Sequence, residues 1–180
     1  GVEEMNEKGH FPSYVYRGYK SDIFEGGHRI PFLARWPNQI EAGTSSNETI
    51  CLTDLLKTCA AINGVDVPSS AGEDSYNILP ALVGRNPSSP IREATVSTAG
   101  NGAFSVRQGR WKLELTGSTG GYGNISQEEV AAKGQPSVQL YDLENDIGET
   151  NNLYAQYPDV IRRLTLLLES YRERGRSTRL

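Results

Sequence analysis

The apolar residues in the first half of the chain fall into two clusters, separated by polar stretches rich in glycine and proline. Residues 30–36, IPFLARW, form an apolar run with a proline near its start. This is typical of a buried strand whose first residues lie outside the hydrogen-bond ladder. Residues 48–63 carry apolar side chains at helical spacing, and Gly64 is placed as a stop. The apolar residues are Leu52, Leu55, Leu56, Cys59 and Ile62. The glycine-broken residues 1–20 predict a surface loop. This half therefore predicts a strand, a loop and a helix of a layered α/β domain.

The pattern changes after a stretch rich in Pro, Ser and Gly at residues 65–90, which contains one short helical piece around residues 78–83. We therefore predict two domains, residues 1–90 and residues 91–180. Four short segments rich in β-forming residues follow: 92–98, 104–107, 110–116 and 138–143. The second and third predict a hairpin, with Gln108 and Gly109 at its turn.

Two helices are predicted around these strands. Ser126 and Glu129 have the spacing of a capping box for a short helix in the long loop before the fourth strand. The last helix begins near Pro158, which suits a first turn. Its apolar stripe consists of Val160, Ile161, Leu164, Leu167, Leu168 and Tyr171. The simplest α+β assembly is a small antiparallel sheet with this C-terminal helix packed on it.

The composition is that of a globular protein and gives no sign of a nucleic-acid-binding or membrane-spanning one. The chain has 180 residues, of which 37% are hydrophobic and 22% charged, as in an ordinary globular protein. The formal net charge of −4 gives no reason to expect a nucleic acid or an acidic membrane as partner. No apolar run approaches the roughly 20 residues that span a bilayer. The chain does not begin with methionine, which suggests a fragment.

The two cysteines, Cys51 and Cys59, are not expected to pair. If both lie on one helix, about 12 Å separates them along its axis, whereas a disulfide needs Cα atoms within roughly 7 Å. We expect buried thiols that act as small hydrophobic side chains. Their spacing does not match a metal site.

One segment carries candidate chemistry. YKSDIFEGGHRIPFLARWP places Lys20 ahead of Glu25-Gly26-Gly27, then an Arg-x-Pro and a Trp-Pro. It resembles a signature region of type I sulfatases, the arylsulfatase-like branch of the alkaline phosphatase superfamily. LTDLLKTCAAING, RQGRWKLEL, YDLENDIGETNNL and the final helix resemble later parts of the same family, in the same order. The resemblance covers nearly the whole chain and implies the C-terminal part of a sulfatase, with an alkaline phosphatase-like fold.

In that family, the lysine that matches Lys20 contacts the sulfate group. An ammonium group stabilises the negative charge that develops on a sulfate ester as its S–O bond breaks. The glycines beside it would let the backbone turn sharply next to the ligand. We therefore predict that Lys20 is catalytic and substrate-binding. The alternative is a solvated surface lysine.

Other residues near Lys20 are weaker candidates. His10 could donate a proton to the leaving alcohol or bind a sugar hydroxyl, or be a surface loop histidine. Arg17 could contact an anionic substrate. For Glu25, His28 and Arg29 we predict structural roles, in which Arg29 ties the loop to carbonyls or a carboxylate.

The resemblance also shows what is missing. The family nucleophile is a formylglycine made from Cys or Ser in a Cys/Ser-x-Pro/Ala-x-Arg string, and neither Cys51 nor Cys59 lies in such a string. The family metal, usually Ca²⁺, is held by acidic residues that would precede Gly1. We expect no metal site in this chain, and no turnover without a missing N-terminal catalytic half. By resemblance, the substrate is a sulfated small molecule or glycan and the location is extracytoplasmic, either periplasmic or secreted.

Two other functions stay open at this point. One is a phosphodiesterase or phosphonate hydrolase of the same superfamily, which a threonine nucleophile or a second metal site in the full-length chain would favour. The other is a non-catalytic glycan-binding module. The aromatic residues are scattered instead of forming a stacking platform, and such a module would leave the lysine motif unexplained.

Overall fold

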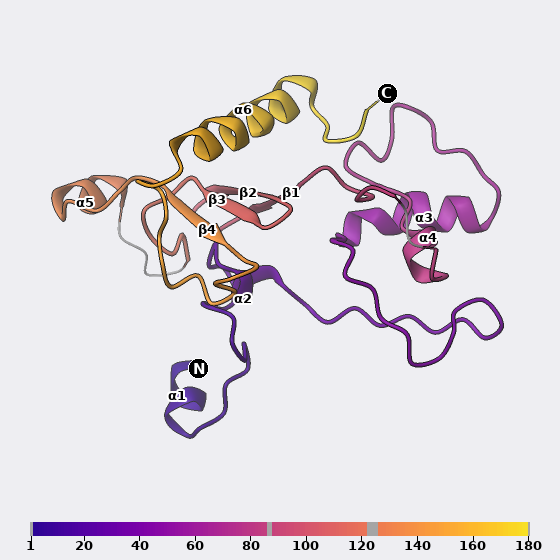
Figure 1. Ribbon diagram of the computed structural model, residues 1–180, viewed down its shortest axis with the longest axis horizontal. Coiled ribbons are helices and arrows are strands. Elements are labelled where there is room, and N and C mark those ends of the chain that lie inside the picture. Colours follow the sequence, from indigo (N-terminus) through magenta and orange to yellow (C-terminus); the bar gives the residue numbers. More distant parts are fainter. Residues whose placement is uncertain (1, 86–87, 122–125, 180) are drawn as a thin grey trace. The chain divides into compact units, whose positions relative to one another are not determined.

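The computed structural model describes residues 2–85, 88–121 and 126–179, which divide into two compact units (Figure 1). The first unit is Gly1–Ile30 with Val96–Leu168, and the second is Pro31–Thr95 with Glu169–Leu180. The predicted domain division between residues 90 and 91 stays a prediction. Among the described residues, no helix combines the length and the apolar character that crossing a membrane requires.

A four-stranded sheet is the scaffold of the first unit. Its order is β1 (Thr95–Thr98), β2 (Phe104–Gln108), β3 (Trp111–Glu114) and β4 (Gln139–Asp142). The β2–β3 and β3–β4 pairs are antiparallel, which confirms the predicted sheet. The hairpin turn differs by one residue. Because Gln108 pairs with Trp111, the two central residues are Gly109 and Arg110, and the positive φ of 58° falls on the glycine.

The two faces of this sheet differ in polarity because alternate residues point to opposite sides. Val106, Leu113 and Leu140 lie opposite one another and are fully buried on one face. The other face carries Ser105, Arg107, Lys112, Glu114, Gln139 and Tyr141. Figure 1 shows α6 on one side of the sheet and α2 (Glu25–His28) on the other.

Helix α6 (Pro158–Arg174) begins against the apolar face. The ring of Tyr157, just before the helix, lies 4.9 Å from that of Trp111. Arg163 donates a hydrogen bond to Gln108. Leu164 is fully buried, as the predicted stripe requires. The predicted packing of this helix on the sheet is confirmed.

Two short helices flank this core. In α5 (Gln127–Ala132), the Ser126 hydroxyl accepts a hydrogen bond from the Glu129 N–H, and the Glu129 carboxylate accepts one from the Ser126 N–H. The predicted capping box is therefore confirmed. The prediction of a loop over residues 1–20 was wrong at its start, where α1 (Val2–Glu7) is helical. No glycine or proline interrupts these six residues, so the helix forms before Gly9.

The second unit is built around a buried carboxylate. It contains η1 (Leu52–Asp54), α3 (Leu55–Ile62) and α4 (Leu79–Leu82). Asp54 accepts hydrogen bonds from the backbone N–H groups of Cys51, at 2.8 Å, and Tyr76, at 2.9 Å. The buried Arg92 pairs with the same carboxylate and stacks over the Tyr76 ring at 4.5 Å. The helices predicted within residues 48–63 and 78–83 are confirmed, and the first begins at Leu52.

The predicted buried strand at residues 30–36 was wrong. The segment has no strand pairing, and its side chains are exposed, Leu33 to 89%. A strand needs a neighbour to satisfy its backbone groups, and no segment among the described residues pairs with this one.

Helix α3 turns its apolar stripe outward. Leu52, just before it, is 60% exposed, Leu56 52% and Ile62 41%, while the polar Thr58 is buried. Thr58 donates to the Asp54 carbonyl at 2.7 Å and accepts from the Ile78 N–H at 3.0 Å. The helix is therefore anchored by its polar side, and an apolar face is left uncovered by the described residues.

The cysteines agree with the prediction only in part. Both thiols are free, so the expected lack of pairing is confirmed. Cys51 is half-buried, and its burial raises the pKa of the thiol. Cys59 is exposed, not buried, because it lies on the outward side of α3, and Cys51 precedes the helix instead of lying in it.

Candidate functional site

Lys20 lies at the tip of a tight turn formed by residues 19–22. The Asp22 N–H donates to the Tyr19 carbonyl at 2.9 Å, and the Asp22 carboxylate accepts from the Tyr19 N–H at 3.0 Å. Ser21 has a positive φ of 85°, as the third residue of a type II turn requires. The Lys20 side chain is exposed and forms no hydrogen bond or ion pair with any described residue. Its ammonium is therefore presented outward from a defined turn.

The turn is fixed to the sheet unit through its backbone. The Ile23 N–H donates to the Thr119 carbonyl at 2.7 Å, and the Gly100 N–H donates to the Ser21 carbonyl at 2.8 Å. Directly after the turn, Ile23 and Phe24 are buried in an apolar cluster. Its other members are Ala99, Tyr141 and Leu143. The lysine turn is thus carried by a rigid base.

Gly26 and Gly27 allow this turn and helix α2 to pack closely. A Cβ atom on Gly26 would lie 2.2 Å from the Gly18 carbonyl oxygen, and one on Gly27 would lie 2.0 Å from the Asp22 carbonyl oxygen. Neither glycine has a positive φ, and both lie in the single helical turn of α2. The sequence needs glycine here because the backbones approach without room for a side chain.

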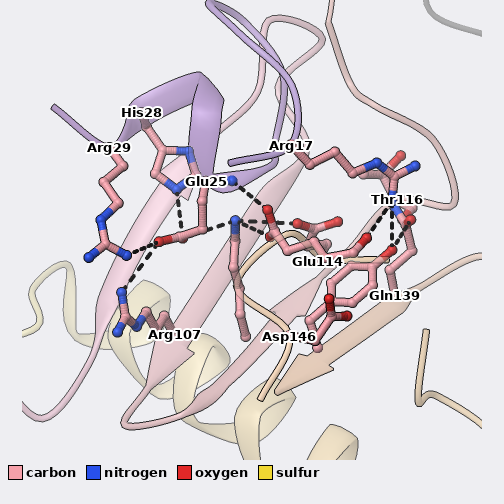
Figure 2. Close-up of polar contacts among 12 residues, drawn as sticks. Arg17, Glu25, His28, Arg29, Arg107, Glu114, Thr116, Gln139 and Asp146 are labelled. Carbon is pink, nitrogen blue, oxygen red and sulfur yellow. Dashed lines mark hydrogen bonds and ion pairs between the residues drawn. The ribbon is translucent and has the colours of Figure 1, made fainter. Parts of the chain in front are cut away.

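Glu25, the first residue of α2, is buried among positive charges (Figure 2). Its carboxylate lies 3.2 Å from the Lys112 ammonium, 3.3 Å from the Arg29 guanidinium, 3.4 Å from that of Arg107 and 3.5 Å from His28 Nε2. Burial alone raises the pKa of Glu25, but the hydrogen bond from His28 and the charges of Lys112 and Arg107 outweigh it and lower the pKa to about 2. The structural roles predicted for Glu25, His28 and Arg29 agree with these contacts.

Lys112 on β3 is the centre of this network, although its side chain is only 1% exposed. Its ammonium lies 2.7 Å from the Glu149 carboxylate and 3.4 Å from that of Glu114, in addition to Glu25. The second carboxylate oxygen of Glu149 accepts a hydrogen bond from the Glu25 N–H at 2.6 Å. A buried cation of this kind is stable only with such partners.

Glu114 is the least satisfied member of the network. Its side chain is fully buried, and neither carboxylate oxygen accepts a hydrogen bond from any described residue. Burial, together with the Glu149 charge, raises the pKa of Glu114 well above its ordinary value of 4.5, although Lys112 acts in the opposite direction. The carboxyl group therefore retains a proton in the folded state at a pH where the unfolded chain has lost it.

We expect Glu114→Gln to stabilise the protein increasingly as the pH rises. Because the folded-state pKa of Glu114 is raised, its contribution to stability is complete below about pH 4.5 and is lost as the pH rises towards that folded pKa, by up to about 1.4 kcal/mol per pH unit. Glutamine has no carboxyl group that titrates, so the variant does not lose stability in this way as the pH rises. Denaturant unfolding of both proteins from pH 4 to 8 would measure the difference, with Glu144→Gln, at an exposed carboxylate, as the control. A difference that does not change with pH would contradict this prediction.

The Arg17 side chain is held by hydrogen bonds and a ring contact within the sheet unit. Arg17 NH1 donates to the Tyr141 hydroxyl at 3.1 Å and to the Glu149 carbonyl at 2.8 Å, and its guanidinium stacks on the Phe24 ring at 3.8 Å. Burial is the largest cause that raises the pKa of Tyr141. Arg17 is thus part of the support of the lysine turn, and its contact with a substrate stays a prediction.

His10 lies exposed beyond α1, where its backbone N–H donates to the Met5 carbonyl at 2.9 Å. Its side chain contacts neither Lys20 nor Arg17 within the described parts of the chain. The predicted role of His10 in substrate binding is therefore neither supported nor contradicted.

Sequence reasoning missed the buried charges of Lys112, Glu114 and Glu149. Lys112 and Glu114 alternate with Trp111 and Leu113, a pattern that predicts a solvated polar face. The available signal was the pair of opposite charges two residues apart on one face. It does not reveal that α2 covers this face, because Glu25 is far away in the sequence.

The described residues do not supply a metal site. No three His, Cys, Asp or Glu side chains among them come together in a way that could hold a metal ion. The calcium ion that the resemblance implies therefore does not fit these residues.

Comparisons with known proteins show which enzymes this chain is similar to. No family model matches it. The N-acetylgalactosamine-6-O-sulfatase of Bacteroides thetaiotaomicron is 33% identical over 172 residues, which are 96% of this chain and 32% of that protein. The N-acetylgalactosamine-6-sulfatase of Sus scrofa is 28% identical over 168 residues, which are 86% of this chain and 32% of that protein.

A solved structure supports the same relationship. It comes from work on the metabolism of multiple glycosaminoglycans by Bacteroides thetaiotaomicron, and it aligns with a TM-score of 0.76 at 31% identity, covering 93% of this chain and 34% of that one. The chain thus spans about a third of the length of the relatives it matches. It belongs to the sulfatase family, with the alkaline phosphatase-like fold, and corresponds to a C-terminal part of these enzymes.

Proposed function

We propose that the full-length protein containing this chain hydrolyses sulfate esters, and that Lys20 contacts the sulfate group. The observation that carries the proposal is the placement of Lys20. Its ammonium is exposed and forms no bond to a described residue, while the turn that carries it is bonded to the sheet unit through Ser21 and Ile23. A surface lysine without a function would not need such a support.

The chemistry follows from the charge of the reacting group. Negative charge accumulates on the bridging oxygen of a sulfate ester as its S–O bond breaks. A positioned ammonium stabilises that charge more strongly in the transition state than in the ground state, and this difference raises the rate. Because the turn is fixed beforehand, little reorganisation is needed when the ester binds.

For the substrate we propose a glycan that carries a 6-sulfated N-acetylgalactosamine. The support is the name of the relative that is 33% identical over 96% of this chain. His10 and Arg17, which precede the lysine turn in the sequence, are the proposed further contacts of this chain with the substrate. An extracytoplasmic location, periplasmic or secreted, would suit such a glycan.

The rest of the enzyme is proposed to complete the site. It would supply the formylglycine nucleophile, and acidic residues outside this chain would hold the calcium ion. It would also cover the exposed stripe of Leu52, Leu55, Leu56 and Ile62. An uncovered apolar face of this kind is typical of an interface.

A substrate assay on the full-length protein tests this proposal. We expect sulfate release from N-acetylgalactosamine 6-sulfate, and much slower phosphate release from the matched 6-phosphate, because the proposed substrate is a sulfate monoester. Ion chromatography measures both products. Faster phosphate release would favour a phosphate-ester hydrolase, and glycan binding without either product would favour a binding module. Either result would overturn the proposal.

A further inference from the structure

We propose that Glu149 is a positioning residue for Lys20. It holds both ends of the segment from Arg17 to Glu25 and thereby fixes the backbone turn that presents the Lys20 ammonium. This inference rests on the proposed contact between Lys20 and the sulfate group.

The C-terminal end of the segment is held by the Glu149 side chain. Its carboxylate accepts a hydrogen bond from the Glu25 N–H at 2.6 Å, at the first residue of α2. A carboxylate at this position also satisfies one of the free N–H groups at the start of the helix. The end of α2 that follows the lysine turn is therefore bonded directly to Glu149.

The N-terminal end is held by the Glu149 backbone. Arg17 NH1 donates to the Glu149 carbonyl at 2.8 Å, and the Arg17 carbonyl in turn accepts from the Gly26 N–H at 2.8 Å. The bond between Gly26 and Arg17 thus joins the two ends of the segment next to Glu149. Gly148, the preceding residue, lies against the Val15 carbonyl, with a Cβ position 3.4 Å away.

Glu149 is itself strongly constrained. Its side chain is fully buried, and its second carboxylate oxygen accepts from the Lys112 ammonium at 2.7 Å. Its backbone has a positive φ of 52°, which is unfavourable for a residue with a side chain. The Asp146 carbonyl accepts from the Glu149 N–H at 3.1 Å, and the Asp146 carboxylate accepts from the Thr150 and Asn151 N–H groups. A strained residue held by this many bonds is expected where its position matters.

The chemistry of the site requires a carboxylate. Both oxygens of Glu149 face donors, the Lys112 ammonium and the Glu25 N–H. In Glu149→Gln, an NH₂ group would face one of these donors, so one of the two bonds is lost. The isosteric change should therefore loosen the segment without removing volume from the core.

The test is a double-mutant cycle in the full-length protein, with N-acetylgalactosamine 6-sulfate as the probe. We expect Glu149→Gln to lower kcat about 10- to 100-fold, as small misplacements of a reacting group do. In a Lys20→Ala background, the same change should lower kcat no further. Asp142→Asn is the control. It removes another buried carboxylate of the sheet, which is bonded to Arg110, to the Glu144 N–H and to the Asn145 side chain but not to this segment, and kcat should stay unchanged.

The outcomes separate the two proposals. Equal losses of kcat from Glu149→Gln in both backgrounds would overturn the positioning role, because Glu149 would then act independently of Lys20. No effect of Lys20→Ala by itself would instead overturn the proposed function. If Glu149→Gln does not fold, Glu149→Asp keeps the charge but shortens the reach. Full kcat in that variant would overturn the inference, and a loss that disappears in the Lys20→Ala background would support it.

Discussion

Replacing Lys20 with alanine in the full-length protein is expected to lower kcat for the sulfate ester by at least ~100-fold, as loss of a group that stabilises the developing charge does. Because the Lys20 side chain is exposed and makes no bond to a described residue, its removal should leave the unfolding temperature unchanged. The loss can therefore be assigned to chemistry and not to folding. Steady-state sulfate release measures the effect.

Lys133→Ala is the matched control, because Lys133 is also an exposed lysine of the sheet unit, at the end of α5. That variant should keep the parental kcat. Lys20→Arg should recover part of the activity, since it restores the charge but not the compact geometry of the ammonium. Near-normal turnover by Lys20→Ala would count against the assigned role.

Lys112→Met is expected to destabilise the protein by about 3–5 kcal/mol, the usual cost of removing one partner of a buried ion pair. Glu25 and Glu149 would remain buried without the ammonium that lies 3.2 Å and 2.7 Å from them. The hydrophobic side chain fills the volume, so the loss would come from the uncompensated charges. Equilibrium unfolding in denaturant measures it.

The Arg110–Asp142 pair gives a comparison within the same sheet. The Arg110 side chain is 42% exposed, so Arg110→Met should cost no more than about 1 kcal/mol. Equal costs for Lys112→Met and Arg110→Met would show that the Lys112 network adds no special stability.

The sequence predicted those elements whose signals are local. The sheet strands, the capping box of Ser126 and Glu129 and the stripe of α6 depend on residues a few positions apart, and all three are present. The strand at residues 30–36 failed because strand formation depends on a partner segment. The stripe of α3 was correctly recognised as apolar, but periodicity does not tell whether a face is covered.

The candidate site also has one part that local sequence predicted and one part that it did not. The exposed loop around Lys20 was predicted from the order of polar and glycine residues. Its support did not, because Glu149 meets Glu25 across 124 positions and Lys112 across 37. Such contacts depend on how the sheet and α2 pack, and no local pattern records them.

The left-handed backbone at Ser21 and Glu149 has a consequence for how this chain tolerates change. A glycine at position 21 would relieve a conformation that costs about 1–2 kcal/mol for a residue with a side chain, so a more stable protein is one substitution away. That gain would come with a freer hinge beside Lys20. Selection for heat resistance alone would favour glycine at this position, whereas selection for turnover would favour serine.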